Sequence, residues 1–104
     1  MAKVKAVFFL PLRDNDGRDL DAEIKAVEVE LYATVVGFTR SGDVTGAYQM
    51  ADGSIAEDAS REYFVVLDES RLDELKDVVR RFKAKTTQEA IYFEVQYNTV
   101  VDFI

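Results

Sequence analysis

The pattern of apolar and polar residues divides the chain into two halves, each of which reads strand, helix, strand. The predicted segments are 4–12, 20–36 and 44–50 in the first half, and 62–67, 71–85 and 90–97 in the second. Segments 4–12 and 62–67 are apolar at both odd and even positions, which is typical of strands covered on both faces. Segment 90–97 alternates between apolar and polar residues, which indicates a strand with one buried and one wet face.

Capping and turn residues mark the junctions between these segments. Asp19 is a candidate N-cap of the first helix, and Gly37 is placed to end it in the left-handed conformation. Ser70, followed three residues later by Asp73, resembles a capping box before the second helix. The pair Asp52-Gly53 predicts a hairpin turn between the halves.

A βαββαβ chain with both helices on one face of an antiparallel sheet is the ferredoxin-like two-layer sandwich, an α+β fold. In that fold the first and third strands are central, and these are the two segments that are apolar on both faces. We therefore expect residues 1–104 to form a single ferredoxin-like domain.

Composition removes several classes of chemistry. The chain contains neither cysteine nor histidine, which excludes disulfides, thiolate catalysis and the commonest general base. We find no catalytic motif, so we expect no cofactor and no metal. The net charge of −7 disfavours binding to nucleic acid, because phosphate backbones are repelled. No apolar stretch approaches the ~20 residues of a membrane span, and we expect a cytoplasmic protein with no membrane partner.

An acidic loop raises the question of calcium. Asp14, Asp16, Gly17 and Glu23 match the third, fifth, sixth and twelfth positions of an EF-hand loop. Leu12 stands at the first position, however, and a strand rather than a helix precedes the loop. The favoured interpretation is an acidic entrance to the first helix, stabilised by the helix dipole.

Five residues are candidate ligand-binding side chains. Arg61 and Glu62, near Glu94 if the strands pair as predicted, would form an ion pair beside a pocket for a carboxylate or phosphate. An ordinary cross-strand salt bridge is the favoured interpretation of these residues. Tyr48 and Tyr92 are candidate ligand contacts or acids, with the two glutamates as bases; packing tyrosines with a polar tip are the other interpretation.

The central strands also predict an apolar patch. If their other face contacts the helices, four side chains must point away from the helices and form one patch with Tyr92: Val7, Phe9, Phe64 and Val66. A second copy of the chain is the commonest cover for such a face. We expect a homo-oligomer, most simply a dimer.

Several short motifs resemble those of a family of uncharacterised small bacterial proteins. The motifs are the Gly-x-Tyr of 46–48, Asp52-Gly53, Ser60-Arg61 and Gln88-Glu89 before the last strand. Family members usually carry tryptophan at the position of Tyr48, and the resemblance implies no function.

Three hypotheses follow. The favoured one is a non-catalytic domain that binds itself or a protein partner through its open sheet face. The second is a cofactor-independent enzyme or small-ligand binder in the cleft of such an assembly, similar to dimeric α/β-barrel proteins. The third is an acidic inhibitor of another protein, including a nucleic-acid mimic.

Overall fold

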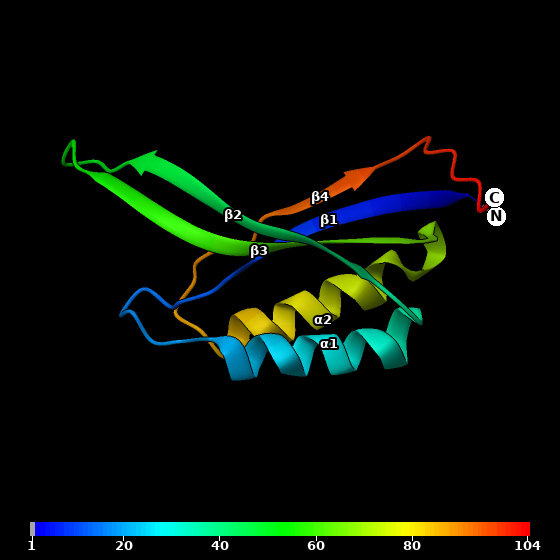
Figure 1. Ribbon diagram of the computed structural model, residues 1–104, viewed down its shortest axis with the longest axis horizontal. Coiled ribbons are helices and arrows are strands. Elements are labelled where there is room, and N and C mark those ends of the chain that lie inside the picture. Colours follow the sequence, from blue (N-terminus) through cyan, green and yellow to red (C-terminus); the bar gives the residue numbers. More distant parts are fainter. Residues whose placement is uncertain (1) are drawn as a thin grey trace.

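The structure, a computed structural model, describes residues 2–104 as a sheet covered on one face by two helices (Figure 1). Its elements are β1 (Lys3–Pro11), α1 (Asp21–Val35), β2 (Thr39–Gln49), β3 (Ile55–Asp68), a 3₁₀ turn (Glu69–Arg71), α2 (Leu72–Ala84) and β4 (Phe93–Gln96). The strand order is β2-β3-β1-β4, and all neighbours are antiparallel. This arrangement confirms the predicted ferredoxin-like α+β fold, with β1 and β3 in the centre.

The core lies between the sheet and the helices. Strand β1 pairs with β3 along its whole length, from Lys3 opposite Asp68 to Pro11 opposite Ser60. Alternate residues of both strands are buried against the helices: Val4, Ala6, Phe8 and Leu10 from β1, and Tyr63, Val65 and Leu67 from β3. The apolar stripes of α1 and α2 close the core from the other side. The opposite face of the sheet, which we call the open face, has no helix over it (Figure 1).

Strands β2 and β3 are longer than the pattern predicted. They continue as a pair past the end of β1, as far as Gln49 opposite Ile55, and the last bond to the body of the sheet runs from the Leu12 N–H to the Ala59 carbonyl. We call residues 44–60 the ribbon; it projects past the ends of the helices in Figure 1 and contributes to the 47 Å length of the molecule. The sequence pattern predicted a strand over 44–50 and the hairpin turn, but it missed residues 39–43 of β2 and began β3 at residue 62 instead of Ile55, because these stretches are mostly polar or small and show no clear alternation of apolar residues.

The predicted hairpin turn at Asp52-Gly53 is present at the tip of the ribbon. The N–H of Met50 donates to the carbonyl of Ser54 at 2.8 Å, and that of Gly53 donates to the carbonyl of Met50 at 2.9 Å. Gly53 has a φ of 87°, so the tight turn ends in a left-handed residue. The Asp52 carboxylate accepts bonds from the N–H and hydroxyl of Ser54.

The predicted helix caps are wrong in detail. The residue with a positive φ after the last residue of α1 is Val36, with a φ of 73°, and not the predicted Gly37. Asp19 accepts a bond from the N–H of Asp21, but the residue at the N-cap itself is Leu20. Helix α2 follows a 3₁₀ turn and has no side-chain cap, because that turn continues directly into the helix and replaces the predicted capping box of Ser70 and Asp73.

The last strand is shorter than the predicted 90–97. It covers Phe93–Gln96 and pairs with β1 from Phe8 to Lys5. Residues 99–104 form no strand, and Val100, Phe103 and Ile104 are exposed. Phe103 lines a groove on the sheet together with Phe64 and Val66.

The positive φ of Gly53 gives a direct test of the ribbon tip. We expect Gly53→Val to destabilise the fold by about 1 kcal/mol or more, because a β-branched residue is strained in the left-handed region. Gly37→Ala is the matched control, since Gly37 has an ordinary φ and open space around its Cα. Urea denaturation checks both, and an unchanged midpoint for Gly53→Val would contradict this account of the turn.

Candidate functional site

A small cleft lies on the open face where the ribbon leaves the body of the sheet. Its volume is about 210 Å³. Strand β1, the ribbon and the segment before β4 supply its walls: Phe9, Pro11, Tyr48, Asp58, Ser60, Gln88, Ala90, Ile91 and Tyr92. Three of the short motifs noted in the sequence therefore meet here, through Tyr48, Ser60 and Gln88.

The ribbon side of the cleft depends on a glycine. Gly46 pairs with Asp58 across the ribbon, and Tyr48 lies two residues further along the same face. A Cβ at position 46 would lie 2.9 Å from the Tyr48 hydroxyl, so the phenol ring lies across Gly46. The absence of a side chain at 46 thus brings the Tyr48 hydroxyl over the strand pair that carries Asp58.

The opposite side is a pair of stacked rings. Phe9 and Tyr92 have centroids 4.5 Å apart with planes 17° from parallel. The Tyr92 hydroxyl donates to a carboxylate oxygen of Glu94 at 2.8 Å. This bond raises the pKa of Tyr92, because the phenol proton is held by an anion. Glu62 lies opposite Phe9 in the sheet, so it and Glu94 stand on the open face beside the two rings, outside the lining of the cleft.

Arg61 does not join this group: the ion pair with Glu62 and Glu94 is absent, and the other interpretation, an ordinary cross-strand salt bridge, is the one that the structure has. Neighbouring residues of a strand point to opposite faces, and Arg61 lies on the helix side, opposite the buried Leu10. Its Nε donates to Asp43 of β2 at 3.0 Å. Arg61 is therefore a cross-strand salt-bridge residue, and it does not supply the cation that the predicted anion pocket required.

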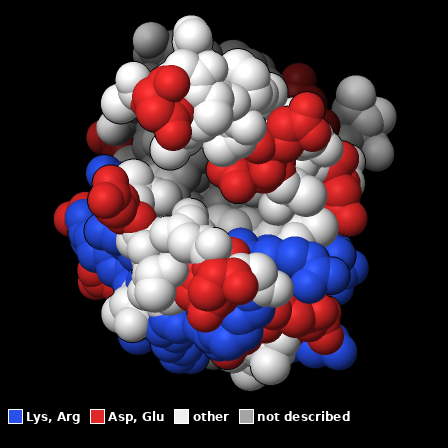
Figure 2. Space-filling model, turned by 90° about the vertical axis from the view of Figure 1, so that its left-hand side faces the viewer, with Lys and Arg blue, Asp and Glu red and all other residues white. Residues whose placement is uncertain are grey.

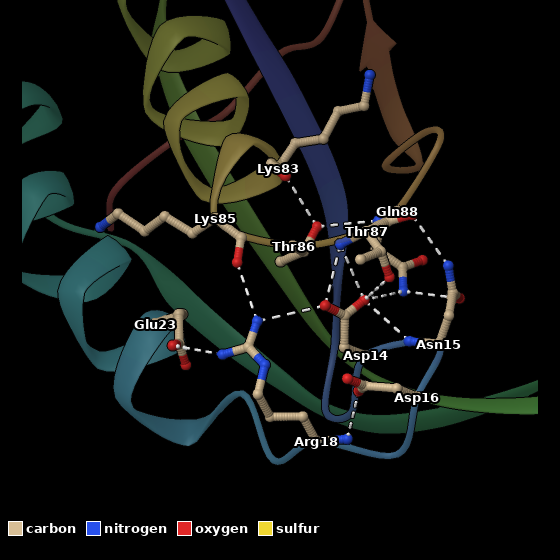
Figure 3. A network of polar contacts seen from close by, with 10 residues as sticks. All are labelled: Asp14, Asn15, Asp16, Arg18, Glu23, Lys83, Lys85, Thr86, Thr87 and Gln88. Atoms are coloured by element: carbon tan, nitrogen blue, oxygen red, sulfur yellow. Dashed lines mark hydrogen bonds and ion pairs between the residues drawn. The ribbon is translucent and has the colours of Figure 1, made fainter.

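Sequence reasoning missed the buried carboxylate of Asp14, which is only 5% exposed (Figure 3). Its oxygens accept bonds from the Thr87 N–H at 2.9 Å, the Thr87 hydroxyl at 2.7 Å and the Asn15 N–H at 2.9 Å. The guanidinium of Arg18 lies 3.3 Å from it and also contacts Glu23 and the carbonyl of Lys85. The bond from the Thr87 hydroxyl, supported by these N–H donors, holds the pKa of Asp14 well below its usual range.

This network positions one wall of the cleft. The side-chain nitrogen of Gln88 donates to Asp14 at 3.2 Å and to Asn15 at 3.1 Å, as Figure 3 shows. Both of its N–H groups are thereby used, so the amide oxygen is the polar group that Gln88 has left for the cleft. The loop after β1 and the loop before β4 are tied together by these bonds, although 73 and 74 positions separate their partners in the sequence.

A larger hollow adjoins the cleft and shares Tyr48 and Asp58 with it. Its volume is about 620 Å³, and it lies between the ribbon and the loop that follows β1. Figure 2 looks onto this end of the molecule and shows the hollow between an upper part with Asp and Glu side chains and a lower part where Lys and Arg gather. The two spaces together are large enough for a ligand of nucleoside size.

The acidic loop has no arrangement for calcium. Asp14 is saturated by protein donors, the side chain of Asp16 accepts the N–H of Arg18, and Glu23 pairs with that same arginine. No group of acidic side chains within residues 2–104 is arranged to hold a metal ion. Among those residues, no helix is long and apolar enough to cross a membrane.

The predicted patch residues lie on the open face, but the chain itself covers part of them. Val7 is only 9% exposed, whereas Phe9, Phe64 and Val66 are partly buried and Tyr92 is 52% exposed. The ammonium group of Lys5 lies 4.4 Å from the centre of the Phe64 ring. The patch is therefore a mixed surface of rings and aliphatic side chains with a cation on it.

The similarity of this chain to known proteins is a similarity of fold alone. Neither a protein-family model nor a curated protein sequence matches this chain. CutA1 from Shewanella sp. SIB1 superposes with a TM-score of 0.71 at 12% identity, over 98% of this chain and 85% of that one. The divalent cation tolerance protein CutA1 of Thermus thermophilus gives 0.68 at 13% identity, over 96% and 87%. A phage SAM lyase in complex with S-methyl-5′-thioadenosine gives 0.63 at 15% identity, over 92% and 81%.

The Asp14 network predicts a specific response to acid. Because the folded pKa of Asp14 lies below the ordinary value of 3.8, its contribution is complete above about pH 4 and is lost as the pH falls further. Asp14→Asn places an amide donor against the Thr87 donors, so we expect the melting temperature at pH 7 to fall by several degrees. We also expect a smaller further loss between about pH 4 and pH 2 than in the wild type. The control is Asp102→Asn, an exposed carboxylate in the tail; a variant with wild-type stability at pH 7 would contradict the role of Asp14.

Proposed function

We propose that this protein is a self-associating ferredoxin-like domain whose open sheet face is the contact between two copies. The observation that carries the proposal is the row of Phe9, Phe64 and Val66 on the two central strands, which no helix covers. Central strands of a two-layer sandwich normally need no apolar residues on the solvent side. A contiguous row of them is the usual mark of an interaction surface.

A second copy fits this face better than an unrelated partner. The face carries both signs of charge, with Lys5 over Phe64 and with Glu62 and Glu94 on its neighbouring strands. In a two-fold dimer through such a face, the cation of one copy can pair with the carboxylates of the other, so the face is able to complement itself.

A stable dimer needs a larger contact area than this row of residues provides. A stable interface buries about 800 Å² per partner, and the central row supplies only a small part of that, because Phe9, Phe64 and Val66 are partly buried. The exposed apolar residues of the ribbon tip and tail can supply the rest: Tyr48, Met50, Ile55 and Phe103. Because an isolated two-stranded ribbon is marginally stable in water, contact with a partner would also stabilise it.

Light scattering tests the proposal. We expect a mass above the 11.8 kDa of one chain at micromolar concentration, and a lower mass for Phe64→Asp. The new carboxylate would lie beside Lys5, so this variant should still fold. Val29→Asp is the matched control, because Val29 is an apolar residue on α1 that is already 69% exposed. A wild-type monomer, or a Phe64→Asp protein of unchanged mass, would contradict the proposal.

The cleft supports a second candidate function, the binding of a small molecule, and it is an alternative to the dimer because Phe9 and Tyr48 would be buried in that contact. What favours it is the part of the lining that the body of the protein holds in place, with stacked Phe9 and Tyr92 on one side and a Gln88 fixed by the Asp14 network on another. The phage lyase with its thioadenosine gives the first compound to try. We expect S-methyl-5′-thioadenosine to cause saturable shifts in the amide resonances of Tyr48, Gln88 and Tyr92. Shifts that are absent, or spread evenly over the surface, would contradict binding at the cleft.

A further inference from the structure

The charge in the lining of the cleft is negative only. Among the residues that the structure describes, Asp58 is the only charged one in its lining, and no lysine or arginine takes part. Two more carboxylates, Glu62 and Glu94, lie on the same face beside Phe9 and Tyr92. Lys5, a cation on the same face, lies over the ring of Phe64. A ligand in the cleft therefore meets a negative potential.

The walls of the cleft carry aromatic rings, and the electron density of these rings determines how strongly they attract a cation. The stacked rings of Phe9 and Tyr92 stand on one side, and the phenol of Tyr48 stands across Gly46 on the other. An aromatic face attracts a cation within about 6 Å of its centre. The hydroxyl of Tyr92 donates to the ionised Glu94, whose pKa is itself lowered, chiefly by its bond from Gln96 and also by this bond. Donation to an anion leaves the ring richer in electrons and strengthens its attraction for a cation.

We propose that this cleft binds an organic onium ion, either a quaternary ammonium or a sulfonium group carried on a small apolar body. The inference rests on the second candidate function above and names its ligand class. A metal ion does not fit, because aromatic faces are poor ligands and no group of acidic residues within 2–104 is arranged to hold one. A primary ammonium ion is strongly hydrated and needs several oxygen acceptors, whereas a methylated onium gives up water easily and suits rings beside one carboxylate.

The size of the site is consistent with an onium head and a larger body. The cleft of about 210 Å³ admits the head, while most ligand pockets measure about 300–1,000 Å³. The adjoining hollow of about 620 Å³ begins at the same Tyr48 and Asp58, so it can hold the rest of the ligand. Asp58 then lies between the two spaces, where it faces the positive atom.

Two probes of equal shape, one charged and one neutral, separate the effect of the positive charge on affinity from the effect of shape. Choline carries a trimethylammonium group, and 3,3-dimethylbutan-1-ol replaces its nitrogen by carbon. We expect choline to bind about tenfold more tightly than the alcohol, measured by titration of the Tyr48 and Tyr92 amide resonances. Asp58→Asn should remove most of this preference and leave the affinity for the alcohol unchanged. Tyr48→Leu should act in the same direction, because it keeps an apolar contact and loses the aromatic face.

A control variant and two distinct outcomes separate the onium inference from the broader proposal of a small-molecule site. Asp73→Asn removes an exposed carboxylate on α2, far from the cleft, and should bind both probes as the wild type does. Far-UV circular dichroism verifies that each variant is folded. Equal affinity for choline and the alcohol would overturn the onium inference while leaving a small-molecule site in place. Failure of choline, the alcohol and S-methyl-5′-thioadenosine to bind at all would overturn both.

Discussion

The antiparallel pairing of β1 with β3 is the constraint on which the rest of the structure depends. Consecutive residue pairs fix the register, from Lys3 with Asp68 to Pro11 with Ser60. Because side chains alternate across a sheet, this one register puts Phe8 and Tyr63 under the helices and Phe9 and Glu62 on the open face. A slip of one residue would bury Glu62 and expose Tyr63. The packed core, the apolar row and the lining of the cleft are thus three results of a single alignment.

The fold could be predicted from sequence because its signals are local. Periodicity located both helices to within one residue at each end, and two strands apolar on both faces identified the centre of the sheet. The misses also have physical reasons. Residues 39–43 of β2 and 55–61 of β3 are mostly polar or small and show no clear period, so both strands were predicted too short. Val36 adopts a positive φ beside an available Gly37, which shows that the path of the chain into β2 overrides local preference at that position.

The site was predictable only in part, because it is assembled from distant segments. Tyr48, Tyr92, Glu62 and Glu94 were chosen by residue type and do lie on one face, whereas Arg61 was assigned to that face against the parity of its strand. The alternation of side chains along a strand would also have placed Asp58 on this face, because it lies two residues before Ser60 and four before Glu62. Asp14 gives no such signal: its partners Thr87 and Gln88 follow the second helix, and nothing in the local sequence marks it as buried.

The ribbon has a consequence for how the molecule moves. From Ala59 to its tip it has no third strand beside it and no helix beneath it, so its hydrogen bonds can open without disturbing the core. In amide hydrogen exchange we expect such a segment to behave as its own cooperative unit with a low opening free energy, and we expect β1 to exchange only with global unfolding. Tyr48 and Asp58 belong to the ribbon, and Phe9 belongs to the body of the sheet. The cleft is therefore a joint between two parts of unequal stability, and anything that contacts both sides slows exchange along the whole ribbon.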